Sequence, residues 1–276
     1  ENKKIHIKEI NSMNKIMKKS IVVGLGEIGS PICKLLSKKT ITIGYDTDQK
    51  LMNLKKFKRY ENSKTLFLHV CIPFSKKFIL NVQKLIKKFE PEIVVIHSTI
   101  SPNTTTILQS KLKIPVLYSP TRGVHKRMLY DLKRYTKFFA ISSNAQKKKF
   151  AINEFTKIMK QVGIKTKKIS KPETLELGKI LCDTSYLGWL INYAQLSNMI
   201  AIQYNVNYDE MWAFSDEIQK FLGNRPKMYP GYIGGHCVIP NIDLIHNQTL
   251  DLIKKINTRY SKKVKNSKSI HKKYTK

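Results

Sequence analysis

The segment Ser20-Ile21-Val22-Val23-Gly24-Leu25-Gly26-Glu27-Ile28-Gly29 predicts the architecture of most of this 276-residue chain. It begins as a short apolar, β-branched run typical of a buried strand, and a Gly-x-Gly-x-x-Gly pattern follows that run without a break. Apolar residues then recur at helical spacing as far as Leu36. A strand, a glycine turn and a helix in this order predict the first half of a βαβ unit that binds a dinucleotide.

The three glycines of this turn have distinct physical roles. Gly24 permits the tight turn, Gly26 lets a pyrophosphate approach the backbone, and Gly29 allows the helix to pack closely on the strand. The next predicted strand ends at Asp46, about 20 residues further on, where a carboxylate can accept hydrogen bonds from ribose hydroxyls. A carboxylate would repel a 2′-phosphate, so we expect NAD rather than NADP. A Rossmann-shaped domain with a different ligand is the alternative.

Short β-rich runs alternate with amphipathic helical stretches as far as Ile169, which predicts βαβ units and a mainly parallel sheet. The runs are apolar on both faces, as strands covered by helices on both sides must be. The predicted fold class is α/β, a Rossmann-type, doubly wound, mainly parallel sheet followed by a smaller all-helical domain built on one long helix. The expected strands are Ser20-Val23, Ile41-Tyr45, Thr65-Val70, Ile93-His97, Val116-Tyr118, Phe138-Ile141 and Lys165-Ile169.

The helical domain begins after Lys171-Pro172, where the pattern changes to one long apolar helix over residues 173–204 and a second helix over 209–222. A long apolar helix needs a partner surface, either the sheet domain or another subunit. The expected organisation is a basic N-terminal extension (1–19), an NAD-binding domain (20–170), a helical domain that carries a cysteine loop (171–253) and a Lys-rich basic tail (254–276).

The chain is strongly basic, since 51 Lys and Arg residues against 19 Asp and Glu residues give a net charge of +32. This excess favours anionic partners. The lysines are spread along the whole chain beside abundant Ile and Asn, so we place codon bias in an AT-rich genome above nucleic-acid binding as the explanation. The four cysteines show no C-x-x-C pair, and no apolar run has the roughly 18 residues of a membrane helix. We therefore expect a reduced, cytoplasmic protein without a membrane span.

Three charged residues recur at helical spacing on the long predicted helix. Glu176, Lys179 and Asp183 are three and four residues apart, so they would share one face. On an isolated helix such a face would be a solvated ladder of ion pairs, but the neighbouring Ile180 and Leu181 are too apolar for a helix in solvent. Near an NAD pocket, Lys179 could act as a general base or donate to a developing alkoxide.

A cysteine stands in a glycine-rich loop, Gly234-Gly235-His236-Cys237-Val238-Ile239-Pro240. The two glycines allow positive φ angles and a close backbone approach to a bound molecule. A lone cysteine is most often a small buried hydrophobe, whereas the adjacent His236, or Lys179, would stabilise a thiolate that attacks carbon. Because neighbouring His and Cys residues cannot readily share one tetrahedral ion, we expect no metal.

Taken in order, these patterns resemble the nucleotide-sugar 6-dehydrogenases, the UDP-glucose/GDP-mannose dehydrogenase family. The resemblance extends from about Ser20 to Asn241. It rests on the glycine turn with Asp46, on His97-Ser98-Thr99-Ile100-Ser101-Pro102 followed by Thr104-Thr105, on Glu176-Leu177-Gly178-Lys179, and on Gly234-Gly235-His236-Cys237.

The resemblance implies a four-electron oxidation of a sugar primary alcohol to a carboxylate, in which Cys237 attacks an aldehyde and water hydrolyses the resulting thioester. It also implies that Lys179 stabilises oxyanions, that Thr99 lies near the catalytic water, and that helix 173–204 forms a homodimer interface. The expected residues are Cys237, Lys179, Thr99, Asp183 and Asn241 for catalysis; Gly24, Leu25, Gly26, Glu27, Ile28, Gly29, Asp46, Cys71, Pro73 and Thr99 for NAD; and Arg122, Lys179, Gly234, Gly235 and His236 for the substrate, an anionic nucleotide sugar.

The chain departs from this family at positions that the resemblance places near the water that hydrolyses the thioester. Where the family loop reads Ser-Pro-Glu, this chain has Ser119-Pro120-Thr121. Asp183 replaces an asparagine and Asn241 replaces an aspartate, an exchange of carboxylate and amide that a shared hydrogen bond could survive in part.

Family members also carry a further α/β domain after the cysteine loop. Without it, the substrate must be smaller, or be held by lysines near Lys254 or by another chain. A two-electron β-hydroxyacid-type dehydrogenase that uses Lys179 and an NAD-binding pseudoenzyme are the alternatives.

Overall fold

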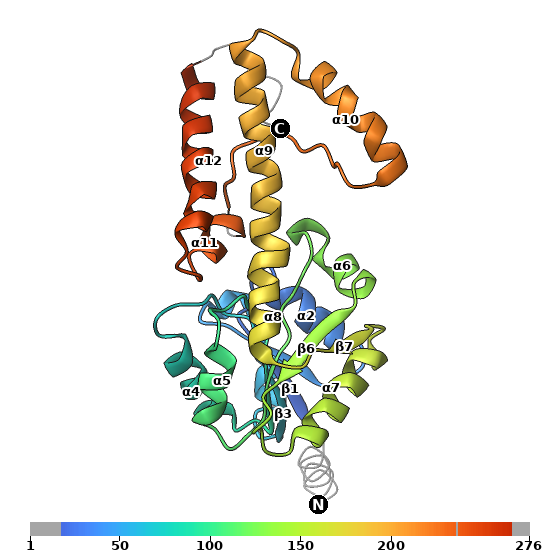
Figure 1. Cartoon of the computed structure of the whole chain (residues 1–276). Coiled ribbons are helices and arrows are strands. Elements are labelled where there is room, and N and C mark those ends of the chain that lie inside the picture. Colours follow the sequence, from blue (N-terminus) through green and yellow to red (C-terminus); the bar gives the residue numbers. More distant parts are fainter. Residues whose placement is uncertain (1–17, 236, 267–276) are drawn as a thin grey trace, which may run out of the picture. The chain divides into compact units, whose positions relative to one another are not determined.

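The computed structural model describes residues 18–235 and 237–266, and the chain forms two compact units. The first unit ends at Leu177 and the second begins at Gly178. The first, which holds the strands labelled in Figure 1, contains a seven-stranded sheet in the order β2-β1-β3-β4-β5-β6-β7. Its strands are β1 (Lys19–Val23), β2 (Thr42–Tyr45), β3 (Thr65–Val70), β4 (Ile93–Ile96), β5 (Val116–Tyr118), β6 (Lys137–Ile141) and β7 (Thr166–Lys168).

The sheet is mainly parallel, which confirms the predicted fold class. β1 lies between β2 and β3, and the parallel pairing continues through β4 to β5. β6 runs antiparallel to β5, so the start of β6 lies beside the carboxyl end of β5. Every predicted strand is present, with its ends within one residue of the expected positions. Because the strand order reverses at β1, the carboxyl ends of β1 and β3 form the place where such sheets bind ligands.

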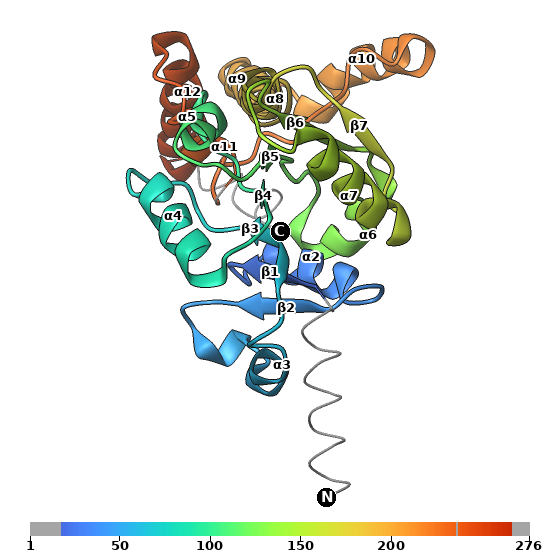
Figure 2. The same cartoon turned by 90° about the horizontal axis from the view of Figure 1, so that it is seen from below.

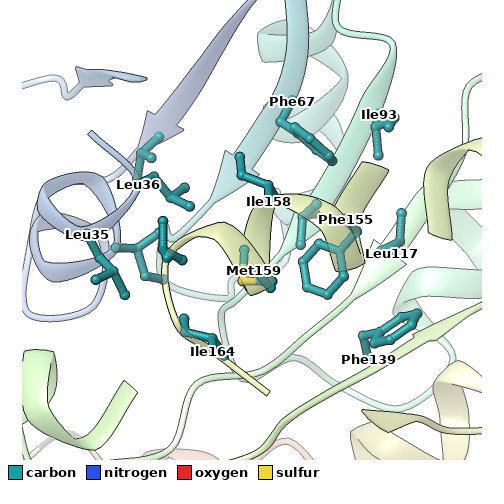
Figure 3. Close-up of a cluster of buried hydrophobic side chains, with 14 of the residues drawn as sticks. Leu35, Leu36, Phe67, Ile93, Leu117, Phe139, Phe155, Ile158, Met159 and Ile164 are labelled. Atoms are coloured by element: carbon teal, nitrogen blue, oxygen red, sulfur yellow. The ribbon is translucent and has the colours of Figure 1, made fainter. Parts of the chain in front are cut away.

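Helices cover both faces of the sheet (Figure 2). One apolar cluster joins the sheet to α2, α6 and α7; Figure 3 shows its centre, where Phe67, Leu117 and Phe155 are buried. The other cluster joins the opposite face to α4 and α5. The helical elements of this unit are α2 (Gly29–Leu36), η1 (Gln49–Leu51), α3 (Leu54–Arg59), α4 (Phe78–Phe89), α5 (Thr104–Ser110), η2 (His125–Arg127), α6 (Met128–Arg134), α7 (Lys148–Gln161) and α8 (Pro172–Gly178).

The second unit is helical and is built around α9, as predicted. The expected single helix over 173–204 is interrupted by a π-helical segment, η3, between α8 and α9. In the second unit α9 packs against α10, α11 and α12, and α11 also packs against η3. The elements are η3 (Lys179–Ser185), α9 (Tyr186–Gln203), α10 (Tyr208–Leu222), α11 (Val238–Ile242) and α12 (Gln248–Asn266).

The expected basic tail over 254–276 is wrong for its described part, because α12 continues to Asn266. Ile253 and Tyr260 are buried in this unit, and so is Asn257. The Asn257 amide binds both backbone groups of Ile233: Oδ1 accepts from the N–H at 2.8 Å and Nδ2 donates to the carbonyl at 3.0 Å. Gln195 of α9 donates to the same Oδ1 at 2.9 Å. The Lys-rich composition of this segment predicts a solvated tail, but α12 is part of the packed unit. Through Asn257 it holds the backbone of Ile233, the residue just before Gly234.

Among the residues that the structure describes, no helix combines the length and the apolar character that crossing a bilayer requires.

Candidate active site

The glycine turn between β1 and α2 has the geometry that its sequence predicts. Gly24 has a φ of +87°, and a Cβ there would lie 2.8 Å from the carbonyl oxygen of Cys71. A Cβ on Gly29 would lie 1.7 Å from the Gly24 carbonyl oxygen, so only glycine lets α2 begin this close to β1. At Gly26, by contrast, no atom lies within 4 Å of an added Cβ, which leaves this backbone open to a ligand.

Asp46 lies beside this turn. Its Oδ2 accepts from the Leu25 N–H at 2.6 Å and its Oδ1 from the Asp48 N–H at 3.0 Å. Partial burial opposes ionisation, but these hydrogen bonds prevail and hold the pKa of Asp46 below its usual range. The carboxylate keeps lone pairs for ribose hydroxyls. An ionised acid next to an exposed glycine turn fits NAD, and the same charge disfavours a 2′-phosphate.

The remaining predicted cofactor residues lie around this edge. Glu27 is exposed and pairs with His125 at 2.8 Å, and Ile28 is half-buried. Cys71 lies against Gly24 and Gly29, and burial raises the pKa of its thiol to about 12, so it stays protonated. Pro73, after β3, is exposed, and Thr99, after β4, is half-buried.

A buried histidine pair, which sequence reasoning missed, lies behind these strand ends. His97 Nδ1 is 2.9 Å from the Ser119 carbonyl oxygen, so it must carry a proton. His97 Nε2 then accepts from His69 Nδ1 at 2.9 Å, which leaves His69 Nε2 bare. This buried nitrogen has no partner among the described residues. The available signal was the position of both histidines at the ends of adjacent strands.

A buried lysine completes this network. Lys137, at the start of β6, donates to the Ser119 carbonyl at 3.0 Å and to the Pro120 carbonyl at 3.3 Å. Its ammonium also lies 3.4 Å from the hydroxyl of Thr121, the next residue of the same turn. Lys137 therefore stabilises the turn after β5. The positive charge of Lys137 also disfavours protonation of either histidine to its cationic form.

We expect both rings to remain neutral well into the acid range. Burial, with a smaller effect of the Lys137 charge, lowers the pKa of His69 to about 3 and that of His97 well below its usual value. Only the unfolded chain binds these protons below about pH 6.5, so the free energy of unfolding should fall from there toward pH 3, by up to about 1.4 kcal/mol per pH unit and ring. Above that window the rings should have no effect.

Nitrogen-15 NMR at about pH 5.5, one unit below the ordinary histidine pKa, checks this prediction. Both rings should be neutral with the proton on Nδ1. An imidazolium signal from either ring would contradict it.

Arg122, a predicted substrate residue, has local partners. Its guanidinium donates to the Thr136 carbonyl at 2.7 Å and lies 4.7 Å from the centre of the Phe138 ring. The side chain is half-buried. These contacts already orient the guanidinium without a ligand.

Glu176 is bound within the first unit, by groups at the start of α5. It is 0% exposed and its carboxylate accepts from the backbone N–H groups of Asn103 (2.7 Å) and Thr105 (2.9 Å) at the start of α5. The Thr105 hydroxyl donates to it at 2.6 Å. Burial raises the pKa of Glu176 in spite of these bonds. Its role in the first unit is to hold α8 on α5.

Lys179 and Asp183 form an ion pair along η3. The Lys179 side chain is only 11% exposed, whereas that of Asp183 is 43% exposed. The π-helical turn that contains both residues is an uncommon geometry often found at functional sites. An amine that is largely shielded from water is suited to donate hydrogen bonds to an oxyanion.

The cysteine loop adjoins this segment within the second unit. Cys237 is exposed and immediately precedes α11, the short helix that packs against η3. Gly235 has the expected positive φ, +77°, whereas Gly234 does not. Asn241 is half-buried on α11. His236, a predicted substrate residue, lies outside the described residues.

The described residues contain no cluster of three or more His, Cys, Asp and Glu side chains that could hold a metal ion.

The sheet order and the glycine turn define a Rossmann-type fold, and solved structures share it. No protein-family model and no curated protein sequence matches the chain. The UDP-D-ManNAc dehydrogenase of Pyrococcus horikoshii is 18% identical with a TM-score of 0.71, over 90% of this chain and 70% of that one. The UDP-N-acetyl-mannosamine dehydrogenase of Staphylococcus aureus is 18% identical with a TM-score of 0.69, over 90% and 69%.

A shorter protein is also similar. The 3-hydroxyisobutyrate dehydrogenase of Mycobacterium tuberculosis is 13% identical with a TM-score of 0.64, over 91% of this chain and 94% of that one. The chain therefore has the fold that nucleotide-sugar dehydrogenases and this hydroxyacid dehydrogenase share. At these identities the similarity is one of fold.

Proposed function

We propose that this chain is an NAD-dependent oxidoreductase of the nucleotide-sugar dehydrogenase type. The observation that carries the proposal is the packing of α11, which begins directly after Cys237, against the π-helical segment that bears Lys179 and Asp183. The glycine turn with Asp46 supports NAD as the cofactor. The structural similarity to two UDP-sugar dehydrogenases supports an anionic nucleotide sugar as the substrate.

The proposed reaction oxidises a sugar primary alcohol to a carboxylate in two steps. NAD, when bound, accepts one hydride in each. The alcohol gives its proton to solvent and its hydride to NAD to form the aldehyde, and Lys179, which the Asp183 carboxylate orients, donates hydrogen bonds to the alkoxide and later oxyanions. The Cys237 thiolate adds to the aldehyde carbon, the thiohemiacetal loses a hydride and a proton to become a thioester, and water releases the acid and restores the thiol. Thr99 and Asn241 are proposed to orient that water.

Replacement of Cys237 by serine tests this function. We expect Cys237→Ser to abolish carboxylate formation from UDP- and GDP-sugars, because a hydroxyl is a far weaker nucleophile at neutral pH. NADH formation and mass-spectrometric detection of the acid are the measurements. Cys182→Ser is the matched control, since Cys182 is likewise exposed and lies on η3; it should retain activity. Absence of NADH with every sugar nucleotide and sugar phosphate would reject the proposal.

A two-electron β-hydroxyacid dehydrogenase is the second candidate. The observation that favours it is the similar hydroxyacid dehydrogenase, of which this chain covers nearly the full length. Here Lys179 would be the base and Cys237→Ser would leave turnover nearly unchanged, with one NADH per product. Retained NAD affinity without turnover on either substrate class would instead support a cofactor-binding pseudoenzyme.

We also propose a homodimer through helix 173–204. α9 contains no charged residue, and Tyr193, Leu196 and Ile200 are 62%, 42% and 45% exposed. In a chain with a net charge of +32, an uncharged apolar face is the surface that a second copy can cover with the least repulsion. Light scattering should give the dimer mass, and Tyr193→Glu should give the monomer. A monomeric wild-type protein at micromolar concentration would contradict this.

A further inference from the structure

A cavity of about 560 Å³ lies at the edge of the sheet opposite the glycine turn. Residues at the amino ends of β1 and β3 line it, together with residues of α3 and of the carboxyl end of α4. Its volume falls within the usual range of small-molecule sites, roughly 300–1,000 Å³. No step of the proposed dehydrogenase reaction uses this cavity.

One wall of the cavity carries a buried cation. Lys19 is 5% exposed, and its ammonium donates to the backbone carbonyls of Tyr60 and Glu61, each at 2.7 Å. An ammonium has three donors, so these bonds leave one of them available. Burial lowers the pKa of Lys19, although the Glu61 carboxylate opposes this. An anion that bound beside Lys19 would relieve that burial cost.

A buried hydroxyl adjoins the same space. Ser63 lines the cavity, is 6% exposed, and its Oγ has no hydrogen-bond partner among the described residues. A buried hydroxyl without a partner costs about 1–3 kcal/mol, so such groups usually mark a missing ligand or water. Among the described residues, Ser63 and Lys19 therefore each line the cavity with a donor that the printed contacts leave available.

The remaining walls supply the opposite charge and an apolar surface. Glu61 and Glu90 line the cavity together with Glu92, which pairs with Lys18, and two further lysines, Lys64 and Lys88, line it as well. Phe57 and Phe89 contribute two aromatic side chains, both of which contact the ring of Tyr45. A small ligand that satisfied this lining would carry an anionic group, a cationic group and an apolar body.

We propose that this cavity binds an α-amino acid with an apolar side chain. Its carboxylate would accept from Lys19 and Ser63, its ammonium would face Glu61 and Glu90, and its side chain would lie against Phe57 and Phe89. None of the lining residues belongs to the glycine turn or to the cysteine loop, so the inference stands whether or not the proposed dehydrogenase activity is found.

Calorimetric titration of the full chain with L-phenylalanine tests the proposal without NAD or substrate. We expect saturable one-to-one binding. L-phenylalanine amide, which lacks the carboxylate, and N-acetyl-L-phenylalanine, which lacks the ammonium, should each bind at least about tenfold more weakly, the equivalent of one charge-assisted hydrogen bond. Equal binding of the N-acetyl compound would overturn the amino-acid class, and absence of binding by L-phenylalanine at millimolar concentration would overturn the site.

Ser63→Ala supplies a variant that keeps the fold. Because the hydroxyl has no partner within residues 18–235 and 237–266, its removal should leave the Tm of the ligand-free protein unchanged or raised, while affinity for L-phenylalanine falls about tenfold. Ser110→Ala, at an exposed serine that donates to its own helix at 2.9 Å, is the matched control and should bind as the wild type does. Equal affinity of the two variants would overturn the role of Ser63 and with it the proposed site.

Discussion

Gly29→Ala should remove most NAD affinity and destabilise the first unit. The added Cβ would lie 1.7 Å from the carbonyl oxygen of Gly24 and 2.9 Å from its carbonyl carbon, both backbone atoms of the turn itself. α2 must therefore move away from β1, which costs about 1–3 kcal/mol or more in strain and lost packing. The displaced turn no longer presents its N–H groups to a pyrophosphate, and we expect affinity for NAD to fall about 100-fold, the loss of about two such hydrogen bonds.

Gly26→Ala is the matched control for this substitution. No atom lies within 4 Å of a Cβ at Gly26, and its φ is not positive, so alanine fits the folded backbone. This variant should keep the wild-type free energy of unfolding but lose NAD affinity, because its methyl group occupies the approach of the pyrophosphate. Urea unfolding and calorimetric titration with NAD separate the two effects. Wild-type stability and affinity in Gly29→Ala would contradict the geometry of the turn.

Glu176→Ala should cost about 3–5 kcal/mol of stability, the largest loss that we expect from one side chain of the candidate site. It leaves three donors without this acceptor: the part-buried N–H of Asn103 and, in a buried position, the N–H and the hydroxyl of Thr105. Glu176→Gln keeps one acceptor oxygen and should lose less. Urea unfolding measures both.

Glu173→Ala is the control for this prediction. Glu173 is only half-buried and accepts from the Thr106 hydroxyl, so its loss should cost at most about 1.5 kcal/mol. If Glu176→Ala and Glu173→Ala were equally stable, the anchoring role of Glu176 would be wrong. The catalytic alternative, a common face with Lys179, predicts instead that Glu176→Ala lowers activity at unchanged stability.

Much of the fold could be predicted because its signals are local. The strand β4 is an uninterrupted apolar run, Ile93–Ile96, which is fully buried as predicted. Such runs identify strands that helices cover on both faces. The antiparallel direction of β6 has no comparable signal, because strand direction depends on how the connection after β5 crosses the sheet.

In the candidate site, the sequence predicted contacts within one helix but not contacts between distant parts of the chain. Helical spacing correctly relates Lys179 to Asp183, which pair one turn apart. The same spacing could not reveal that Glu176 binds Thr105, 71 residues earlier in the chain, because spacing within a helix takes no account of other elements. The Lys-rich composition likewise concealed Asn257, whose amide holds the backbone of Ile233.

The sequence by itself determined the glycine turn, since positive φ at Gly24 and the space around Gly29 are properties of a few adjacent residues. It also determined the order of strands and helices along the chain through their apolar periodicity. Only the tertiary structure decided which polar groups meet: His69 with His97, Lys137 with Ser119, Glu176 with Thr105. These contacts join residues on different elements. Hydrogen bonding depends on distance and direction, which arise only when the elements have packed.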